Sequence, residues 1–247
     1  MRQVVHEEHE DADHWWFRAR REIFARQLER HLRTDERPRI LDLGPGGGVN
    51  LPVLLPRGDV TCVDLDAGSL ARVGEQGARG LRADASRLPI GDGSADAICA
   101  LDVLEHLDDD VGALADWHRA LAPEGLLLLS VPALDLLWGR QDVLAEHRRR
   151  YDRATLRTRL LDAGFELERL TYFNTLLFPP VLGVRLAMRP WLGRASEGGS
   201  DLGLRLPGWI EELLFRTFSA EGAWLERRDL PIGVSLMAVA RPRRDGR

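Results

Sequence analysis

Apolar and polar positions along the chain switch repeatedly between a period of two and a helical period, which is the pattern of an α/β domain. Short apolar runs bounded by glycine, proline or charged residues predict strands over 40–43, 60–63, 80–83, 97–101, 126–131, 165–173 and 232–240. Amphipathic segments between them predict helices over 17–32, from 49 onward, and over 67–76, 109–121, 152–163 and 209–218. Strands that alternate with helices in this way form one sheet with helices packed on it.

A dense group of glycines follows the first expected strand. Four of the five residues from 44 to 48 are glycine, and Pro45 is the exception. A helix-like run comes next, and then a second strand that ends on Asp64. Strand, glycine turn, helix, strand and terminal acid form half of a nucleoside-binding unit, in which the glycine backbone approaches the ligand and the acid holds the ribose hydroxyls.

The spacing of these glycines discriminates between nucleoside classes. A dinucleotide fingerprint needs G-x-G-x-x-G/A, but Val49 and Leu51 stand at the third position in the two registers. A Walker loop needs Gly-Lys-Ser/Thr, which the sequence lacks. What remains is D-x-G-x-G-x-G over 42–48, with an acid twenty residues after Gly44. This pattern resembles motif I and the following ribose acid of class I S-adenosylmethionine-dependent methyltransferases.

The resemblance continues in register downstream. Residues 82–96 are similar to the family's G-D-A-x-x-L-P-F-x-D-x-S-F-D pattern, and 103–106 match its V-L-E-H motif. By this resemblance Asp84 accepts the adenine amino group and Ala85 offers its backbone N–H, whereas the alternative is that Asp84 only caps a turn. The cofactor contacts that the whole pattern implies are Asp42, Gly44, Pro45, Gly46, Gly48, Asp64, Leu65, Asp84, Ala85, Leu101 and Asp102.

The segment 134–151 follows the end of the expected fifth strand and therefore borders the acceptor side of the site. It resembles a W-x-x-H-D-x-x-x-x-H-x-R-R-Y signature of a bacterial branch of the family, with Gln141 where that branch often has histidine. His147 is the first expected general base, and His106 and Tyr151 are further candidates. The residues expected to contact the acceptor are Trp138, Asp142 and Arg149.

Two of these assignments have alternatives. His106 is interpreted equally as a cofactor contact or as a structural histidine. The arginine run 148–150 is interpreted either as a solvated face or as a grip on an acceptor carboxylate by Arg148 or Arg149, because guanidinium pairs with carboxylate in bidentate fashion.

Residues 1–37 are expected to form a helical lid in front of a methyltransferase domain over 38–247, which carries an apolar insertion at about 175–220. Two adjacent tryptophans cannot both face the core from one helix, which favours a lid with Trp16 and Arg18 beside the methionine part of the cofactor. Indole attracts cations such as a sulfonium. The alternative is that the aromatic residues pin this helix onto the sheet.

The composition excludes several other classes. A chain of 247 residues with net charge −5 and a pI of about 5.8 argues against a broad nucleic-acid surface. Cys62 and Cys99 lie in apolar strand segments, which predicts core thiols in a reducing compartment. No carboxylate–histidine group has metal-ligand spacing, so no metal is expected. The acidic N-terminus does not resemble a signal peptide, so a cytoplasmic location is expected.

The apolar run 176–192 is interrupted by prolines and arginines, so we expect that it does not span a bilayer. Three roles are open to this run: peripheral contact with a membrane surface, the lining of an apolar acceptor pocket, or a cover for the sheet edge.

The resemblance implies a Rossmann-like αβα sandwich with a seven-stranded, mostly parallel sheet in the order 3-2-1-4-5-7-6. It implies methyl transfer from S-adenosylmethionine to a small-molecule or lipid-like acceptor at oxygen, nitrogen or a carboxylate, with S-adenosylhomocysteine as product, typically in secondary metabolism and by a monomer or homodimer. Two alternatives stay open: a cyclase-like protein that uses the bound sulfonium without methyl transfer, and a non-catalytic binding subunit.

Overall fold

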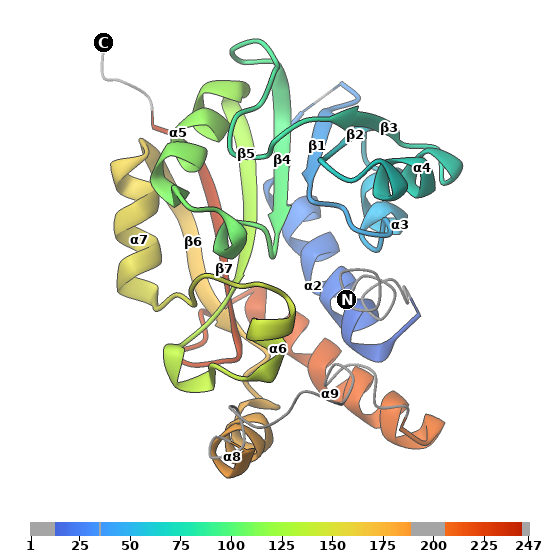
Figure 1. Cartoon of the computed structure of the whole chain (residues 1–247), viewed down its shortest axis with the longest axis vertical. Helices are drawn as coiled ribbons and strands as arrows, with labels where there is room; N and C mark the ends of the chain where they lie inside the picture. The colour runs from blue at the N-terminus through green and yellow to red at the C-terminus, as the bar shows by residue number, and fades with distance from the viewer. Residues whose placement is uncertain (1–12, 35, 189–205, 244–247) are drawn as a thin grey trace.

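The computed structural model describes residues 13–34, 36–188 and 206–243, and it contains a seven-stranded sheet in the order β3-β2-β1-β4-β5-β7-β6 (Figure 1). The strands are β1 (Arg39–Leu43), β2 (Asp59–Asp64), β3 (Arg79–Arg82), β4 (Ala95–Leu101), β5 (Leu121–Pro132), β6 (Phe165–Phe173) and β7 (Ser235–Pro242). Strand β7 pairs antiparallel with both β5 and β6, and the other pairings are parallel. The expected strand order and fold class are confirmed.

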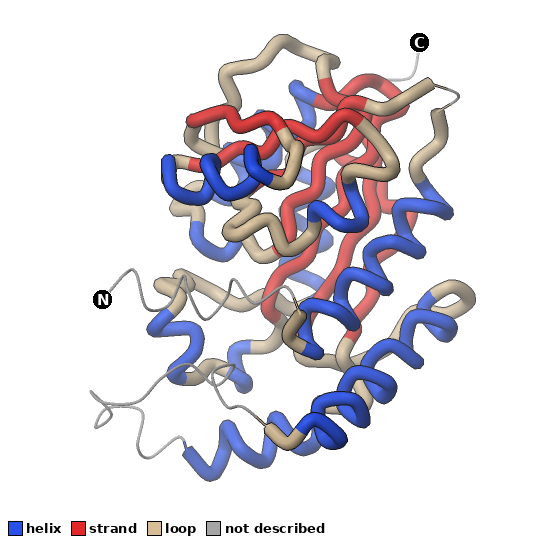
Figure 2. The backbone as a smooth tube through the Cα atoms, turned by 90° about the vertical axis from the view of Figure 1, so that its right-hand side faces the viewer, coloured by secondary structure: helices blue, strands red, loops and turns tan. Residues whose placement is uncertain are grey.

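Helices cover both faces of this sheet (Figure 2). They are α2 (Trp15–His31), α3 (Leu51–Leu54), α4 (Ala67–Glu75), α5 (Asp110–Ala120), α6 (Arg140–Leu144), α7 (Arg153–Asp162), α8 (Phe178–Met188) and α9 (Gly208–Leu225), with the 3-10 turns η1 (Leu104–His106) and η2 (Asp135–Leu137). Helix α2 packs against α9 and β5, while α5 and α7 pack against each other and against β5 and β6 respectively. None of the helices in the described ranges has the length and apolar content needed to cross a bilayer.

The central strands are mostly apolar, with Asp42 and Ser130 as buried exceptions, because helices cover them on both sides. Residues 97–101 of β4 and 126–131 of β5 are all buried, so neither strand alternates between apolar and polar positions. Cys62 in β2 and Cys99 in β4 are buried free thiols, as expected for core residues. Burial raises the pKa of Cys99 well above that of an exposed thiol, so this cysteine is neutral and unreactive.

Helix α2 belongs to the same hydrophobic core as the sheet. Ala19, Ile23, Phe24 and Leu28 are almost fully buried on one face of the helix, and Trp16 packs on Phe218 of α9 with ring centroids 5.2 Å apart. The aromatic residues therefore pin this part of the N-terminal segment to the fold. Residues 1–12 and most of the link between α8 and α9 lie outside the described residues, so the lid and the insertion stay predictions.

Several elements differ in length from the sequence expectation. The helix after the glycine loop is only four residues long, with proline in its first turn. Helix α9 continues seven residues past Phe218, because Gly222 and Leu225 stay on the buried face and Gly222 lies against Ile23 and Arg26 of α2. Strand β7 begins at Ser235, three residues later than expected.

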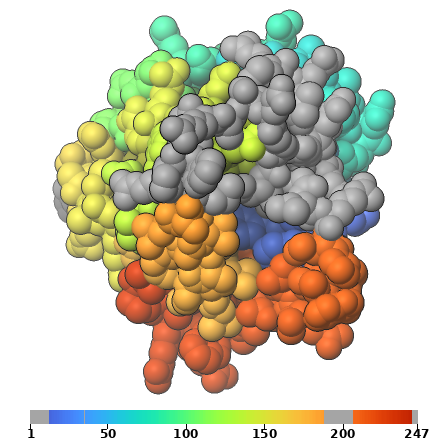
Figure 3. Space-filling view, turned by 60° about the horizontal axis from the view of Figure 1, so that its bottom comes forward, coloured from blue at the N-terminus to red at the C-terminus, as the bar shows by residue number. Residues whose placement is uncertain are grey.

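The carboxyl ends of the parallel strands all point to the end of the molecule that carries α6, α8 and α9 (Figure 1). Seen from that end, α8 and α9 form much of the surface (Figure 3). In open α/β sheets ligands bind beyond these strand ends, so this edge is where a site is expected.

We expect Gly233→Ala to lower the free energy of unfolding by about 2–3 kcal/mol, because the added Cβ would overlap the backbone carbonyl of buried Phe173 and push β7 away from β6. Gly183→Ala in α8 is the matched control, since its Cβ would meet nothing within 4 Å and alanine is the better helix former. Urea denaturation of both variants measures the difference, and equal stability would contradict this packing of the turn before β7.

Candidate functional site

The glycine loop after β1 is tightly packed on one side and open on the other. Gly44 has φ +58°, and a Cβ there would lie 2.9 Å from Cγ2 of Val103. Gly46 has φ +56°, yet a Cβ there would meet nothing within 4 Å. The left-handed backbone and the contact with Val103 explain the glycine at position 44, and the open space at position 46 lets a ligand approach the main chain.

Side chains from α4 hold this loop in place. The amide of Gln76 donates to the Gly47 carbonyl at 2.8 Å, and the Ser69 hydroxyl donates to the Gly46 carbonyl. These bonds occupy carbonyl oxygens of the loop, which leaves the loop rigid while its open side stays accessible.

Asp64, at the end of β2, is oriented and still accessible. Its Oδ1 accepts the backbone N–H of Asp66 at 2.9 Å, and its Oδ2 accepts the Ser69 hydroxyl at 3.2 Å. The next residue, Leu65, is 61% exposed, although leucine usually packs inside. A half-buried carboxylate beside an exposed apolar side chain suits the ribose and the base of a nucleoside.

Asp42 is a buried acid in β1, below the loop. Its Oδ2 has no hydrogen-bond partner among the described residues, and burial, followed by the charge of Asp64, raises its pKa to about 7. A buried carboxyl without a partner is suited to accept a hydrogen bond from a cationic group of a ligand.

The turn after β3 is held by its own side chain and by a buried tryptophan. Oδ1 of Asp84 accepts the backbone N–H of Ser86 at 2.8 Å, so the turn-capping alternative is observed, and a role in binding adenine stays a prediction. The carbonyl of Ala85 accepts Nε1–H of fully buried Trp117 at 2.7 Å. Trp117 therefore positions this turn. The helical apolar pattern around Trp117 indicates only a core residue and does not reveal this role.

Beyond β4, an ion pair joins α2 to the sheet. Arg20 Nη1 lies 2.5 Å from Oδ2 of Asp102, and its Nη2 donates to the Ser130 hydroxyl at 2.9 Å. That hydroxyl donates to Oδ1 of Asp102 at 3.1 Å. Burial raises the pKa of Asp102, but the charge and hydrogen bond of Arg20, together with His147 and the Ser130 hydroxyl, outweigh it and hold this pKa below the ordinary value. Asp102 also has φ +61°, a strained conformation that is common at functional sites.

Arg20 was missed in the sequence, although a signal existed. It lies four residues before Phe24 on the apolar face of α2, where a charge needs a buried partner. Trp16 and Arg18 contact α9 instead: Trp16 packs on Phe218, and the Arg18 guanidinium lies 4.2 Å from the ring centroid of Phe215. Their predicted contact with the methionine part of a cofactor therefore stays a prediction, and Arg20 is the arginine of α2 that reaches the strand ends.

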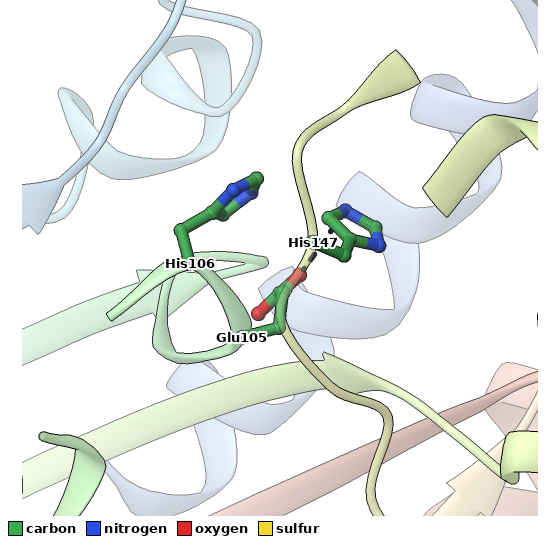
Figure 4. Close-up of side chains that lie close together, drawn as sticks. All are labelled: Glu105, His106 and His147. Carbon is green, nitrogen blue, oxygen red and sulfur yellow. Dashed lines mark ion pairs between the residues drawn. The ribbon is translucent and has the colours of Figure 1, made fainter. Parts of the chain in front are cut away.

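Glu105, His106 and His147 come together (Figure 4), and the charge of Asp102 acts on the first two. Glu105 and His106 belong to η1, and His147 follows α6. The two segments are tied by the backbone N–H of Arg148, which donates to the Glu105 carbonyl at 2.9 Å. The His106 and His147 ring centroids lie 4.8 Å apart, and Nε2 of His147 lies 3.9 Å from Oε1 of Glu105. Because 41 residues separate His106 from His147 in sequence, local spacing does not show this group.

Asp142 orients His147. Its Oδ1 lies 2.9 Å from Nδ1 of His147, and the carboxylate also accepts the Gly139 N–H and two hydrogen bonds from Arg150. Burial raises the pKa of Asp142, but the hydrogen bond from His147 and the charge of Arg150 hold it below its usual range. Asp142 therefore stays ionised, and Nε2 of His147 is the nitrogen that faces Glu105. Gln141 stands where the related branch has the histidine of a His–Asp pair. In this structure Asp142 is instead paired with His147.

Glu105 and His106 have unusual environments. Glu105 is fully buried, and neither carboxylate oxygen has a hydrogen-bond partner in the described structure. Burial, together with the nearby charge of Asp102, raises the pKa of Glu105 well above its usual value. Burial and the neighbouring His147 lower the pKa of His106 to about 4, although its ring is hydrogen-bonded to the backbone of Glu146. His106 is therefore neutral at physiological pH.

The remaining predicted acceptor residues lie apart from this cluster or at its edge. The Tyr151 hydroxyl donates to Oδ2 of Asp110 at 3.0 Å, and Arg149 Nη1 lies 3.2 Å from the same oxygen. Burial and then Asp110 raise the pKa of Tyr151 above that of a free phenol. Both side chains thus bind Asp110, the first residue of α5. Trp138 is half-buried between η2 and α6.

Comparison with known proteins adds independent information. Residues 41–129 match a family model described as a methyltransferase domain. A Mycobacterium tuberculosis protein named as a probable S-adenosylmethionine-dependent methyltransferase is 30% identical over 161 residues, which are 63% of this chain and 57% of that protein. The chain thus covers less than two thirds of the length of this relative.

Solved structures share the fold. A SAM dependent methyltransferase from Archaeoglobus fulgidus superposes with a TM-score of 0.56 at 17% identity, covering 90% of this chain and 94% of its own. The [4+2]-cyclase SpnF superposes with a TM-score of 0.59 at 22% identity, covering 90% of this chain and 80% of its own. At these identities the likeness shows the fold alone.

We expect Arg20→Met to destabilise the protein by about 3 kcal/mol, because it leaves the carboxylate of Asp102 without its counter-charge. The matched control is Arg18→Met on the same helix, which removes only the contact with Phe215 and should cost less than about 1 kcal/mol. Urea denaturation at pH 7 separates the two, and a loss for Arg20→Met no larger than that for the control would contradict the structural role of this ion pair.

Proposed function

We propose that the chain is a class I S-adenosylmethionine-dependent methyltransferase and that it transfers the methyl group of this cofactor to a small-molecule or lipid-like acceptor. The observation that carries the proposal is the glycine loop, open at Gly46, which lies between two acids. They are Asp42, whose Oδ2 lacks a partner among the described residues, and Asp64, whose carboxylate is oriented by hydrogen bonds. Each of these features fits a part of the cofactor.

The residues present fit S-adenosylmethionine. We assign the ribose hydroxyls to Asp64, the adenine amino group to Asp84 and the ammonium of the methionine part to Asp42. Gly46 lets the main chain approach the ligand, and Leu65 offers apolar area to the base. When bound, the cofactor supplies a methyl group activated by a sulfonium, and S-adenosylhomocysteine is what remains.

On the acceptor side we assign activation to His147. A hydroxyl is a poor nucleophile until it loses its proton, and histidine is the usual base. Asp142 fixes the imidazole through Nδ1, so Nε2 is free to take the proton, and the negative carboxylate stabilises the protonated ring. A carboxylate acceptor is less well supported, because Arg149 is already paired with Asp110 and Arg148 with Asp108.

An apolar acceptor is supported by the surface of α8 and α9 (Figure 3). Large apolar side chains there are exposed to solvent: Val184 and Leu186 in α8, and Trp209, Leu213 and Trp224 in α9. Exposed apolar area of this extent typically marks a binding surface. We therefore keep a lipid-like acceptor, or peripheral contact with a membrane surface, as part of the proposal.

A cyclase-like use of the bound sulfonium has no specific observation in its favour. The likeness to a [4+2]-cyclase shows the fold alone, as stated above. The mass of the product decides this point directly, because methyl transfer adds 14 mass units to the acceptor, about the mass of one CH₂ group, and cyclisation adds none.

We expect calorimetric titration to show micromolar binding of both S-adenosylmethionine and S-adenosylhomocysteine, and Asp64→Ala to weaken both by at least about ten-fold. The reason is the loss of about two charge-assisted hydrogen bonds to the ribose. Asp59→Ala, at the opposite end of β2, is the control, since this carboxylate contacts only Arg37 at the surface. No binding of either compound by the wild-type chain would overturn the proposed function, and equal binding by both variants would overturn the ribose assignment.

For His147→Ala we expect a loss of turnover of about 10²–10⁴-fold with cofactor affinity unchanged, because the acceptor loses its activating group while the glycine loop is untouched. The measurement is S-adenosylhomocysteine release with a panel of small hydroxylated and lipid acceptors, alongside the cofactor titration. His118→Gln, a histidine packed on Phe165 away from the cluster, is the control. Turnover equal to that of the wild type would remove His147 from the mechanism.

A further inference from the structure

We infer that Glu105, His106 and His147 form a binding site for a divalent transition-metal ion. These side chains offer one carboxylate oxygen and two imidazole nitrogens that all lie within 4.8 Å of one another (Figure 4). Two histidines and one carboxylate are a common donor set for catalytic metals, because the remaining coordination positions stay open to water or substrate.

The buried carboxylate of Glu105 is the observation that points most directly to a cation. It is fully buried, and both of its oxygens lack a hydrogen-bond partner in the described part of the chain. The two arginines whose charges act on Glu105 are paired with other acids, Arg20 with Asp102 and Arg150 with Asp142. A buried carboxylate is costly unless it is paired or coordinates a metal, so an ion between Glu105 and the histidines accounts for its position.

Both histidines are held in the way that metal-ligating histidines are held. His147 has its Nδ1 on the carboxylate of Asp142, and the His106 ring is hydrogen-bonded to the backbone of Glu146. In metal sites the ring nitrogen that does not bind the ion usually donates to a carboxylate or a backbone carbonyl, which fixes the tautomer and aims the other nitrogen. Asp142 is itself fixed by Arg150 and by the Gly139 N–H.

The distances between the ligand atoms suit a small ion once the side chains move slightly closer together. Two ligands bonded to one ion at about 2.1 Å lie at most about 4.2 Å apart. Oε1 of Glu105 and Nε2 of His147 are 3.9 Å apart, and all the ligand atoms lie within 4.8 Å of one another. Tetrahedral ligand atoms at that bond length lie about 3.4 Å apart, so the pairs must close by up to about 1.4 Å. Imidazole ligands favour zinc, iron, nickel or copper over manganese, calcium and magnesium, which oxygen ligands suit better.

The role of the ion, unlike its binding, rests on the proposed function. At the end of β4 it would coordinate an acceptor oxygen and lower the pKa of that hydroxyl, whose proton then leaves to water. In the metal-loaded protein Nε2 of His147 is a ligand, and in the metal-free protein it is the base. The acceptor class favoured by such a site is an alcohol, phenol or catechol, because these provide an oxygen ligand.

The test is metal binding by the full chain, which needs no acceptor. Chelator-treated protein is titrated with Zn²⁺ and Mn²⁺ by calorimetry, and bound metal after gel filtration is measured by mass spectrometry. We expect one ion per chain with at least micromolar affinity for Zn²⁺. His106→Ala and His147→Ala should each weaken binding at least 100-fold, whereas the control His118→Gln should bind as the wild type does.

Two conservative variants exclude a merely structural explanation. Glu105→Gln keeps the shape of a buried and partnerless side chain, so it should fold with at least wild-type stability and yet bind Zn²⁺ at least 100-fold more weakly. Asp142→Asn weakens the group that orients His147 and should cost about 10–100-fold in metal affinity. Because it also removes the counter-charge of Arg150, its affinity is measured under conditions where urea denaturation shows the variant to be folded. Co²⁺ substituted for Zn²⁺ should give visible absorption bands that both variants weaken.

The outcomes separate this inference from the proposed function. Absence of a bound ion, or equal binding by all of these variants, overturns the metal site even if S-adenosylmethionine binds. Binding of one Zn²⁺ that depends on Glu105, His106 and His147 supports the site even if the cofactor titration fails.

Discussion

The ion pair between Arg20 and Asp102 determines how the ligand side of this protein is put together. An unpaired charge in this position would be costly, so α2 has one docked arrangement in which Arg20 meets both Asp102 and the Ser130 hydroxyl. Asp102 leads directly into η1, which carries Glu105 and His106. The pair therefore connects the N-terminal helix to the turn that faces His147, and it does so beside the glycine loop.

The two sides of the site use their charges differently. On the cofactor side, Asp64 is oriented and accessible, and Asp42 is buried with an oxygen that lacks a partner. This arrangement favours a cationic, hydroxyl-rich ligand. On the acceptor side, burial keeps His106 neutral, and the charge of Asp142 is balanced by Arg150 and used to orient His147. An acceptor molecule thus meets mostly neutral groups. Such a site suits an acceptor whose reacting hydroxyl loses its proton and whose remaining part is apolar.

The parts of this structure that local patterns encode could be predicted from the sequence, and the parts that depend on distant residues could not. Buried strands are continuous apolar runs, and the turn after β1 is rich in glycine. Both features can be recognised from a few consecutive residues of the sequence. The role of Arg20 depends on Asp102 and Ser130, which are 82 and 110 residues away. The partner of His147 in the cluster, Glu105, is hidden in the same way, because only the docking of two loops brings them together.

The distance between Arg20 and Ser130 along the chain also bears on how the protein is made. During synthesis α2 leaves the ribosome before the sheet, but the serine and the carboxylate that receive its guanidinium are translated only after four strands of the sheet. Until then the apolar face of α2, with its buried arginine, has no stable place to pack. Contacts of such long sequence separation form late in folding, because the intervening chain must first be ordered. The nascent chain thus exposes the apolar face of α2 at least until β5 and α9 have been made, and a chaperone that shields apolar helices during translation would act on this segment.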